Sequence, residues 1–459
     1  MSFTRRQILT GLAGLGVVGL GAGGTRYWLG RTQAGATHDY QLIAAPQDLE
    51  LVPGHLTPAW VYGGQASGVE LRVKQGEWLR VRFINKLEVP TTIHWHGIRL
   101  PLDMDGVPYV SQLPVLPGEH FDYRFQVPDA GNFWYHPHLS SSEQLGRGLV
   151  GPLIVEEREP TGFLHERTLS LKSWHVDEQG AFTAFSLPRE AARGGTPGRL
   201  STVNGAHAPT LALPAGQVVR LRVLNLDNTL TYRLNLPGAE ARLYALDGNP
   251  IEPRPLGKDY WLGPGMRLDL ALRVPEAGRE LALRNGPLRL ATLLAVAEPQ
   301  QASAPGDWPQ ALPANPVAEP DLATAETLKF NFEWSAALVD DNAQAGSHRY
   351  WQINGQAWDL NDKSCAERPI AKLQLGRSYI FELRNMAQYQ HPIHLHGMTF
   401  KVLSSDRKTV IPYFTDTYLL GKNERARIAL VADNPGVWMF HCHVIDHMET
   451  GLMAAIEVA

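Results

Sequence analysis

The hydrophobic and polar positions alternate over short runs from residue 38 onward, and Gly, Pro, Asn and Asp separate the runs. VELRVKQGEWLRVRFINKL (69–87) contains two such runs around Gly76, and HFDYRFQVPDAGNFWYHPHL (120–139) repeats the pattern. Alternation with a period of two is typical of strands with one buried face, whereas helical spacing of apolar positions is scarce. The pattern therefore predicts an all-β chain of sandwiches or barrels.

An internal repeat divides this β pattern into three related units. Residues 71–97, 211–238 and 371–397 align by eye, each as strand, Gly turn, strand ending in Asn, and third strand. PDAGNFWYHPH (128–138) also matches DNPGVWMFHCH (433–443). We expect domains over 37–157, 158–297 and 323–459, with the Pro- and Ala-rich segment 298–322 as a linker.

Composition narrows the function classes. The chain has 459 residues, 44% of them hydrophobic, and a formal net charge of -4. The mild negative charge gives no reason to expect nucleic acid as a partner. Two cysteines exclude a disulfide scaffold, and Cys365 is expected to be a structural or free thiol.

The first 36 residues have the form of an export signal. FTRRQILTGLAGLGVVGLGAGG (3–24) places Arg5 and Arg6 before an apolar, glycine-rich stretch that is too short to form a stable membrane span. A small-x-small pattern at 34–36 predicts cleavage after Ala36, with an uncleaved anchor as the alternative. We expect the twin-arginine export machinery as a partner and the periplasm as the destination.

Histidine is concentrated in four clusters in the first and third units, which hold ten of the 17 histidines: His94 and His96; His136 and His138; His391, His394 and His396; His441, His443 and His447. A single His-x-His pair is weak evidence, because a buried histidine often only satisfies a hydrogen bond. Four clusters at equivalent positions of two repeats indicate a metal site. The middle unit has Tyr232, Leu234 and Asn235 in the corresponding place and no histidine pair.

Strand geometry groups these histidines. Residues two apart project from the same face of a strand. Four pairs, hence eight imidazoles, therefore face one way: His94 with His96, His136 with His138, His394 with His396, and His441 with His443. If the first and third domains dock with these faces together, the eight line one pocket between them.

Odd spacings place three other side chains apart from that pocket. Cys442 lies between His441 and His443, and His391 is three residues from His394, so both point to the opposite face. With His447, they predict a second site of two histidines and one cysteine. This trigonal set is typical of a blue-copper electron-transfer centre, whereas structural zinc, the alternative, prefers closed four-ligand, thiolate-rich sets.

These motifs resemble those of the multicopper oxidase family, in particular its laccase-like group. HWHG (94–97), HPH (136–138), HPIHLHG (391–397) and HCHVIDHMETGL (441–452) match the four ligand motifs of the family in order. The overall form is similar to short bacterial enzymes of the pseudomonad CumA type. The resemblance covers nearly the whole mature chain and implies three cupredoxin-like domains and four copper ions.

The resemblance also implies how the ligands divide. The type 1 copper takes His391, Cys442 and His447, and the type 2 copper takes His94 and His394. The binuclear type 3 pair takes the remaining six histidines: His96, His136, His138, His396, His441 and His443.

Two further positions follow from the resemblance. Leu452 stands at the axial position of the type 1 copper, where leucine cannot coordinate and a relatively high potential is expected, unless a shifted turn brings in Met453. Asp105 matches an acidic residue near the type 2 copper and is the expected proton donor, with a turn aspartate before Gly106 as the alternative reading.

Other acidic positions are less clear from the sequence. Met448 stands where many bacterial relatives have a proton-donating Glu, so Glu449 or Asp446 would have to substitute. Asp416 is expected to be a structural turn residue, with the substrate rim as the alternative.

The expected function is an oxidase that couples one-electron oxidation of a phenol or another reductant to reduction of dioxygen to water. The alternatives are a metallo-oxidase for Mn(II) or Cu(I) and a non-catalytic periplasmic scaffold. The eight methionines form no run, which counts against a dedicated Cu(I) oxidase, and no ligand position is missing, which counts against a scaffold. A monomer is expected.

Overall fold

The structure is a computed structural model that describes residues 36–297, 307–335 and 349–459. The expected export signal therefore falls outside the described residues, except for Ala36. Short helices interrupt a chain of strands: η1 Leu102–Met104, α1 Ser141–Gly146, α2 Pro188–Ala191, η3 Cys365–Glu367 and α3 Ile445–Glu449. In the described part of the chain, no helix is long and apolar enough to span a membrane.

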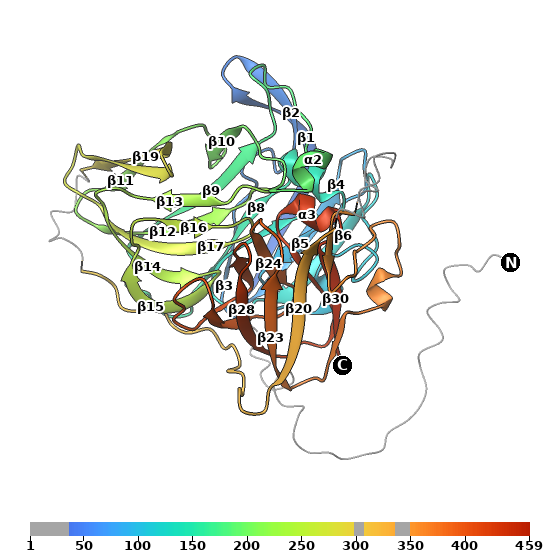
Figure 1. Cartoon of the computed structure of the whole chain (residues 1–459). Helices are drawn as coiled ribbons and strands as arrows, with labels where there is room; N and C mark the ends of the chain where they lie inside the picture. The colour runs from blue at the N-terminus through green and yellow to red at the C-terminus, as the bar shows by residue number, and fades with distance from the viewer. Residues whose placement is uncertain (1–35, 298–306, 336–348) are drawn as a thin grey trace. The chain divides into compact units, whose positions relative to one another are not determined.

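Three groups of strands follow one another along the chain, coloured from blue to red in Figure 1. The first is β1 Thr37–Val52, β2 His55–Tyr62, β3 Leu71–Lys74, β4 Trp78–Asn85, β5 His94–His96, β6 His120–Gln126, β7 Gly131–His136 and β8 Gly151–Glu156. The second is β9 His165–Trp174, β10 Leu200–Val203, β11 Thr210–Pro214, β12 Val218–Asn225, β13 Tyr232–Asn235, β14 Glu240–Leu246, β15 Asn249–Pro255, β16 Tyr260–Leu262, β17 Arg267–Arg273, β18 Glu280–Asn285 and β19 Leu288–Val296. The third is β20 Glu326–Trp334, β21 Trp351–Ile353, β22 Ala371–Leu373, β23 Ser378–Asn385, β24 His391–Leu395, β25 Phe400–Ser405, β26 Tyr413–Thr415, β27 Thr417–Leu420, β28 Arg425–Val431, β29 Gly436–Cys442 and β30 Met453–Val458.

Each group forms two sheets, which gives six sheets and confirms the predicted all-β architecture of three cupredoxin-like domains. The first domain has the orders β2-β1-β4-β6 and β3-β8-β7-β5. The second has β10-β9-β12-β17-β14-β15 and β11-β19-β18-β13-β16, and the third has β21-β20-β23-β28-β25-β26 and β22-β30-β29-β24-β27. The second and third orders correspond strand for strand, as the sequence repeat predicts.

Alternation along the strands explains how each pair of sheets closes over a core. In β4, Leu79, Val81 and Phe83 are buried, and the residues between them are exposed or partly exposed. β12 departs from this rule, because all eight of its residues are buried. Its two charged side chains, Arg220 and Arg222, point away from the apolar core and form ion pairs with carboxylates that include Glu157. A strand covered on both faces therefore needs buried ion pairs to satisfy its polar positions.

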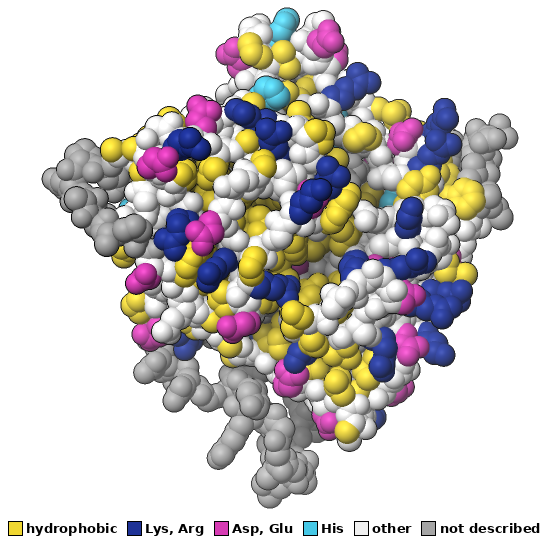
Figure 2. All heavy atoms as spheres, turned by 60° about the vertical axis from the view of Figure 1, so that its left-hand side comes forward, with side chains coloured by type: hydrophobic (Ala, Val, Ile, Leu, Met, Phe, Trp, Pro, Cys, Tyr) yellow, Lys and Arg dark blue, Asp and Glu magenta, His cyan; other side chains and the backbone are white. Residues whose placement is uncertain are grey.

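The described part of the expected linker, 307–322, contains no strand but lies against the second domain. Trp308 lies under the guanidinium groups of Arg242 and Arg273, and Leu312 is buried in the same apolar cluster as Tyr244. On the face drawn in Figure 2, Lys and Arg side chains are interspersed with Asp and Glu, around a hydrophobic region near the middle of the view. This mixture agrees with the small net charge.

Candidate metal centres

Strand ends and the connections after them carry all eleven predicted ligands. β5 holds His94 and His96, and β24 and the turn after it hold the cluster from His391 to His396. β7, β29 and the connections that follow them supply the remaining ligands: His136, His138, His441, Cys442, His443 and, on α3, His447. All eleven side chains are buried.

His391, Cys442 and His447 form a compact triangle. The Cys442 Sγ lies 3.6 Å from each imidazole Nδ1, and the two Nδ1 atoms are 3.1 Å apart. Donor atoms that share one metal at bond lengths of about 2.0–2.3 Å have separations of this size. The triangle therefore fits a metal held by two histidines and one cysteine.

The surroundings fix this triangle and close it off. His447 Nε2 donates to the Arg193 carbonyl at 2.7 Å, which leaves its Nδ1 as the acceptor that faces the sulfur. The Trp351 ring lies 4.3 Å from the His447 ring, and its indole N–H donates to the Ala191 carbonyl. Figure 1 shows α2 of the second domain next to α3.

Cys442 is chemically suited to a metal rather than to free-thiol reactivity. Burial raises the pKa of its thiol well above the usual range, so the thiolate form requires a cation nearby. Leu452 is buried in the same apolar cluster as Cys442, whereas Met453 is buried in a different cluster with Trp134 and Met448.

The other eight histidines come together from the first and third domains. They form three close groups: His94, His96 and His394; His96, His136 and His443; and His138, His396 and His441. Within each group, one donor atom per residue lies within 4.8 Å of the others. The strand argument thus predicted a real juxtaposition of residues about three hundred positions apart in the sequence.

The rings at the centre are stacked across the domain boundary. His94 stacks on His396 and His96 stacks on His394, both with ring centroids 3.8 Å apart. Each stacked pair therefore takes one ring from each domain.

Hydrogen bonds fix one nitrogen of most of these rings and leave the other without a protein partner. The Nδ1 atoms of His94, His136 and His394 each donate to a backbone carbonyl at 2.9 Å, and their Nε2 atoms are buried without a partner. His96 is reversed, because its Nε2 contacts Thr417 Oγ1 at 3.2 Å and its Nδ1 has no partner. Unpartnered buried nitrogens of this kind need a ligand.

Two facing nitrogens show that the ligand is a cation. His396 Nε2 and His441 Nε2 lie 3.0 Å apart. Each ring donates from its Nδ1, to an Asp105 oxygen and to the Cys442 carbonyl respectively, so both Nε2 atoms carry lone pairs. Two lone pairs at this distance repel each other unless a cation, either a metal ion or a proton, lies between them.

Burial keeps these imidazoles in the metal-binding form. For nine of the ten ligand histidines, burial lowers the pKa, and for most of them neighbouring histidines lower it further: His96, His136, His138, His391, His394, His396, His441, His443 and His447. Neutral imidazole is the form that binds copper.

Two buried carboxylates lie behind the stacked rings. Asp105 places one oxygen 3.1 Å from His94 Nδ1 and the other 2.9 Å from His396 Nδ1. Asp416 occupies the corresponding place behind the other pair, with Oδ1 3.3 Å from His96 Nε2 and 3.4 Å from His394 Nδ1. Because Asp416 is buried, it is not part of a substrate rim.

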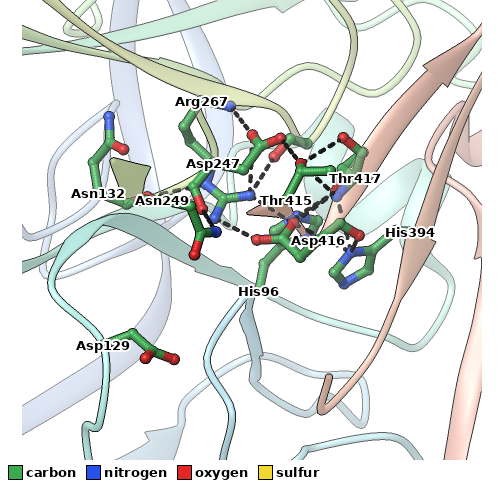
Figure 3. Close-up of polar contacts among 12 residues, drawn as sticks. His96, Asp129, Asn132, Asp247, Asn249, Arg267, His394, Thr415, Asp416 and Thr417 are labelled. Atoms are coloured by element: carbon green, nitrogen blue, oxygen red, sulfur yellow. Dashed lines mark hydrogen bonds and ion pairs between the residues drawn. The ribbon is translucent and has the colours of Figure 1, made fainter. Parts of the chain in front are cut away.

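The structure adds residues that the sequence did not single out. Arg267 of the second domain pairs with Asp416, and Asp247 lies beside both (Figure 3). Burial alone would raise the pKa of Asp416, but the Arg267 guanidinium holds it below its usual range, whereas burial and the Asp416 charge raise the pKa of Asp247. No sequence signal points to Arg267, because no motif surrounds it.

A cavity of about 620 Å³ reaches from Lys363 and Asn361 to His138. Met448 and Glu449 line it, and Glu449 accepts a hydrogen bond from the Ser142 backbone N–H at 3.1 Å. Asp446 instead accepts from the backbone N–H and hydroxyl of Thr196, both at 2.7 Å. Of the two acids that could replace the absent glutamate at 448, only Glu449 is therefore a lining residue.

Comparisons with known proteins agree with this geometry. Residues 45–160 and 334–459 each match a sequence profile described as multicopper oxidase. The chain is 77% identical to a multi-copper oxidase from Pseudomonas thermotolerans, with a TM-score of 0.88. The match covers 93% of this chain and 100% of that one. A multi-copper oxidase from Pseudomonas parafulva is 69% identical, with a TM-score of 0.85 and coverage of 92% and 100%.

More distant relatives share the same form. A multicopper oxidase from Campylobacter jejuni, described as a metallo-oxidase, is 26% identical over 92% of this chain and 91% of that chain, with a TM-score of 0.78. The multicopper oxidase MmcO of Mycobacterium tuberculosis is 28% identical over 93% of this chain and 88% of its own.

The fold and the two donor sets define a copper-dependent oxidase of three cupredoxin-like domains. The chain belongs to the multicopper oxidase family. Its cofactor is copper, its oxidising substrate is dioxygen, and it needs a reducing substrate. The predicted family, fold class, enzyme class and cofactor are confirmed.

Proposed function

We propose that the enzyme oxidises small neutral or anionic phenols, one electron at a time, at the surface above His447. When bound, copper supplies one-electron transfer at the type 1 site and reduction of dioxygen to water at the trinuclear site. The protein residues hold the ions, connect the two donor sets and control which donors come close.

The assignment of ligands to individual ions is part of this proposal. The triangle of His391, Cys442 and His447 would hold the type 1 copper, and His94 with His394 the type 2 copper. The type 3 pair would take two groups of three: His96, His136 and His443; and His138, His396 and His441. This division is supported by the donor atoms of each group of three, which lie within 4.8 Å of one another.

Cys442 connects the two donor sets. Its sulfur faces His391 and His447, while its chain neighbours His441 and His443 belong to the cluster of eight. His441 Nδ1 also donates to the Cys442 carbonyl at 2.9 Å. An electron that enters at the sulfur therefore has a short covalent path to the cluster.

The segment that covers His447 supports the choice of donor. The Arg193 carbonyl accepts the His447 Nε2–H, so the backbone of this segment lies between the imidazole and solvent. This segment, residues 188–199, has three exposed arginines, Arg189, Arg193 and Arg199. Its one acidic residue, Glu190, is partly buried. A cationic surface of this kind attracts phenolates and repels Mn(II) and Cu(I).

Charge reversal at Arg193 tests the donor class, because only the side chain changes and the carbonyl contact remains. In Arg193→Glu, kcat/KM for a carboxylate-bearing phenol should fall several-fold, and that for a cationic donor should rise. Arg279→Glu is the matched control, since Arg279 is an exposed arginine of the same domain that pairs with nearby Glu276. Equal effects of both variants, or no effect of Arg193→Glu, would contradict the proposal.

A metallo-oxidase is the second candidate, and similarity to the Campylobacter jejuni protein described as one supports it. Oxygen uptake by the copper-loaded enzyme with a phenol, Mn(II) and Cu(I) as sole donors separates the two. Faster turnover with either metal ion than with any phenol would favour this candidate.

We also propose that Asp105 is a proton donor for oxygen reduction, since its carboxylate lies against His94 and His396. Leu452 would be the non-coordinating axial residue of the type 1 copper.

Residues 1–36 would direct export of the folded chain, as a monomer, to the periplasm by the twin-arginine route, with cleavage after Ala36. The paired Arg5 and Arg6 support this proposal. Retention of an Arg5→Lys, Arg6→Lys variant in the cytoplasm, and a monomer mass by light scattering, are the expected results.

A further inference from the structure

Arg267 is fully buried at the start of β17 and contacts all three domains (Figure 3). Its Nε donates to the Asn132 carbonyl of the first domain at 3.0 Å, and its Nη1 donates to Gly265 of its own domain at 3.2 Å. Toward the third domain, Nη1 and Nη2 donate in parallel to the two Asp416 oxygens, at 2.8 and 2.7 Å. A bidentate pair of this geometry fixes the carboxylate in both position and plane.

Asp416, held in place by Arg267, contacts two histidines of the trinuclear site. It lies where the chain passes from β26 in one sheet to β27 in the other. Its carbonyl accepts the His394 Nδ1–H at 2.9 Å, and its Oδ1 lies 3.3 Å from His96 Nε2. The Thr417 hydroxyl donates to the same Oδ1 at 2.8 Å.

These contacts decide which nitrogen of each ring is free. His96 is held through Nε2 and presents Nδ1, whereas His394 is held through Nδ1 and presents Nε2. The partner of the outer nitrogen sets the tautomer and the plane of a metal-binding imidazole. Asp416 Oδ1 lies within 3.4 Å of both His96 Nε2 and His394 Nδ1, so a rotation of the Asp416 carboxylate would disturb a ligand from each of the two domains.

Two glycines leave room for the Arg267–Asp416 ion pair and for the ligand His443. Gly97 follows His96 with φ +85°, and a Cβ there would lie 2.5 Å from both Arg267 Nη2 and Asp416 Oδ2. Gly265 has φ +81°, and a Cβ there would lie 2.8 Å from His443 Cγ. Any larger residue at either position would displace the ion pair or a ligand.

A second carboxylate holds the other side of Arg267. The Arg267 backbone N–H donates to Asp247 Oδ1 at 2.6 Å, and Thr415 donates its hydroxyl to Asp247 Oδ2. The second domain thus contributes both the cation and the group that orients it.

We propose that Arg267, from the domain without copper ligands, is a positioning residue of the trinuclear copper site. It fixes Asp416, and Asp416 in turn sets the ring orientation of His96 and His394. The second domain therefore takes part in oxygen reduction although it holds no copper ligand.

Arg267→Lys in the copper-loaded enzyme tests the proposal, because lysine retains the charge but cannot form the parallel pair. We expect the intense visible band of the type 1 copper to be unchanged. The near-ultraviolet band of the type 3 pair and the type 2 signal in electron paramagnetic resonance should weaken, with fewer coppers per chain. Reoxidation of the reduced type 1 copper by dioxygen should slow by about 10–100-fold, the usual effect of removing an outer partner of a metal ligand.

Arg220→Lys is the matched control. Arg220 is a buried arginine of the same domain, with Nε 2.8 Å from Asp269 Oδ2 and Nη2 2.7 Å from Glu157, and it contacts no copper ligand. This variant should lose stability but keep all copper signals. Type 2 and type 3 signals and a reoxidation rate equal to wild type in Arg267→Lys would overturn the proposal, and so would an equal loss in Arg220→Lys.

Asp416→Asn keeps the test decisive if Arg267→Lys does not fold. The amide has the size of the carboxylate, but only one of its two terminal atoms is an acceptor, so the parallel pair with the guanidinium is lost. The same selective loss of type 2 and type 3 signals is expected, and an unchanged spectrum would overturn the proposal.

Discussion

The second and third domains have the same strand order, and a register comparison shows how they differ. In the third domain, Ile393 pairs with Cys442 and His394 with His441. In the second, Leu234 pairs with Asn285 and Asn235 with Arg284. Asn285 and Arg284 therefore stand where the cysteine and the first histidine would be, on an equivalent scaffold.

The connection after this strand differs more than the strand itself. In the second domain, β18 returns directly into β19 through a tight turn, with Asn285 opposite Leu288. In the third, residues 443–452 and helix α3 separate β29 from β30, and they carry His443, His447 and Leu452. The strands thus provide the scaffold, while the connection supplies His447, one of the three residues of the His391–Cys442–His447 group.

The second domain supplies no metal ligand but contacts residues of both donor sets. Its turn at Gly265 lies against His443, its Arg267 holds Asp416, and its segment at Arg193 covers His447. A domain without ligands can therefore support two copper sites at once, and four variants and conditions test this division of roles.

The largest effect is expected from Cys442→Ser, which gives the third domain a non-thiolate side chain at the place of Asn285. Without the thiolate, the visible charge-transfer band and the covalent link to the cluster are lost. Turnover with every donor should fall by more than about 100-fold, since loss of an outer partner alone costs about 10–100-fold. Cys365→Ser is the control, because Cys365 lies outside both donor sets, and activity that survived Cys442→Ser would refute the electron path.

Asp105→Asn should be next in size. Asp105 supports His94 and His396 from the first domain, as Asp416 supports His96 and His394 from the third. Asparagine cannot take up or release a proton in place of the carboxyl group, so oxygen reduction should slow by about 10–100-fold while the type 1 spectrum stays intact. A wild-type rate of oxygen uptake at saturating donor would show that Asp105 is only a turn residue.

Acid should destabilise the copper-free protein, and most of the effect should come from the first and third domains, which hold the ligand histidines. Burial lowers the pKa of their ligand histidines, whereas histidines of the unfolded chain titrate near about 6.5. The unfolded state then binds more protons below that pH, so the free energy of unfolding falls as pH drops through it.

Thermal unfolding of the copper-free protein between about pH 8 and 5 measures this dependence. His136→Gln should reduce the slope, and replacement of the exposed His55 by Gln should leave it unchanged. A melting temperature that stayed flat over this range would contradict the prediction.

Leu452→Met should have the smallest effect. A weak axial thioether lowers the potential of the type 1 copper without removing the ion, and turnover should change by less than about tenfold. Redox titration of the visible band checks the direction. Met453→Leu is the control, since Met453 lies in a different apolar cluster from Cys442, and a larger shift in the control would exchange the two assignments.

The sequence predicted the strands, the three-fold repeat and the meeting of ligands from distant motifs, because period-two alternation and strand faces are local properties. It could not predict Arg267 or the Arg193 carbonyl. Arg267 lies in an ordinary strand pattern, and its role depends on how three domains dock. Asp416 was expected to be a turn residue, and it does lie at a turn, but its burial against His96 follows only from tertiary packing.

The hydrogen-bond contact between His96 and Thr417 joins residues 321 positions apart. A contact of this sequence separation closes a very long loop, so its entropic cost is high unless the intervening chain is already ordered. The complete set of eight imidazoles therefore comes together only when the first and third domains are docked. Copper occupancy of the trinuclear site would then distinguish molecules whose first and third domains have docked from molecules in which they have not.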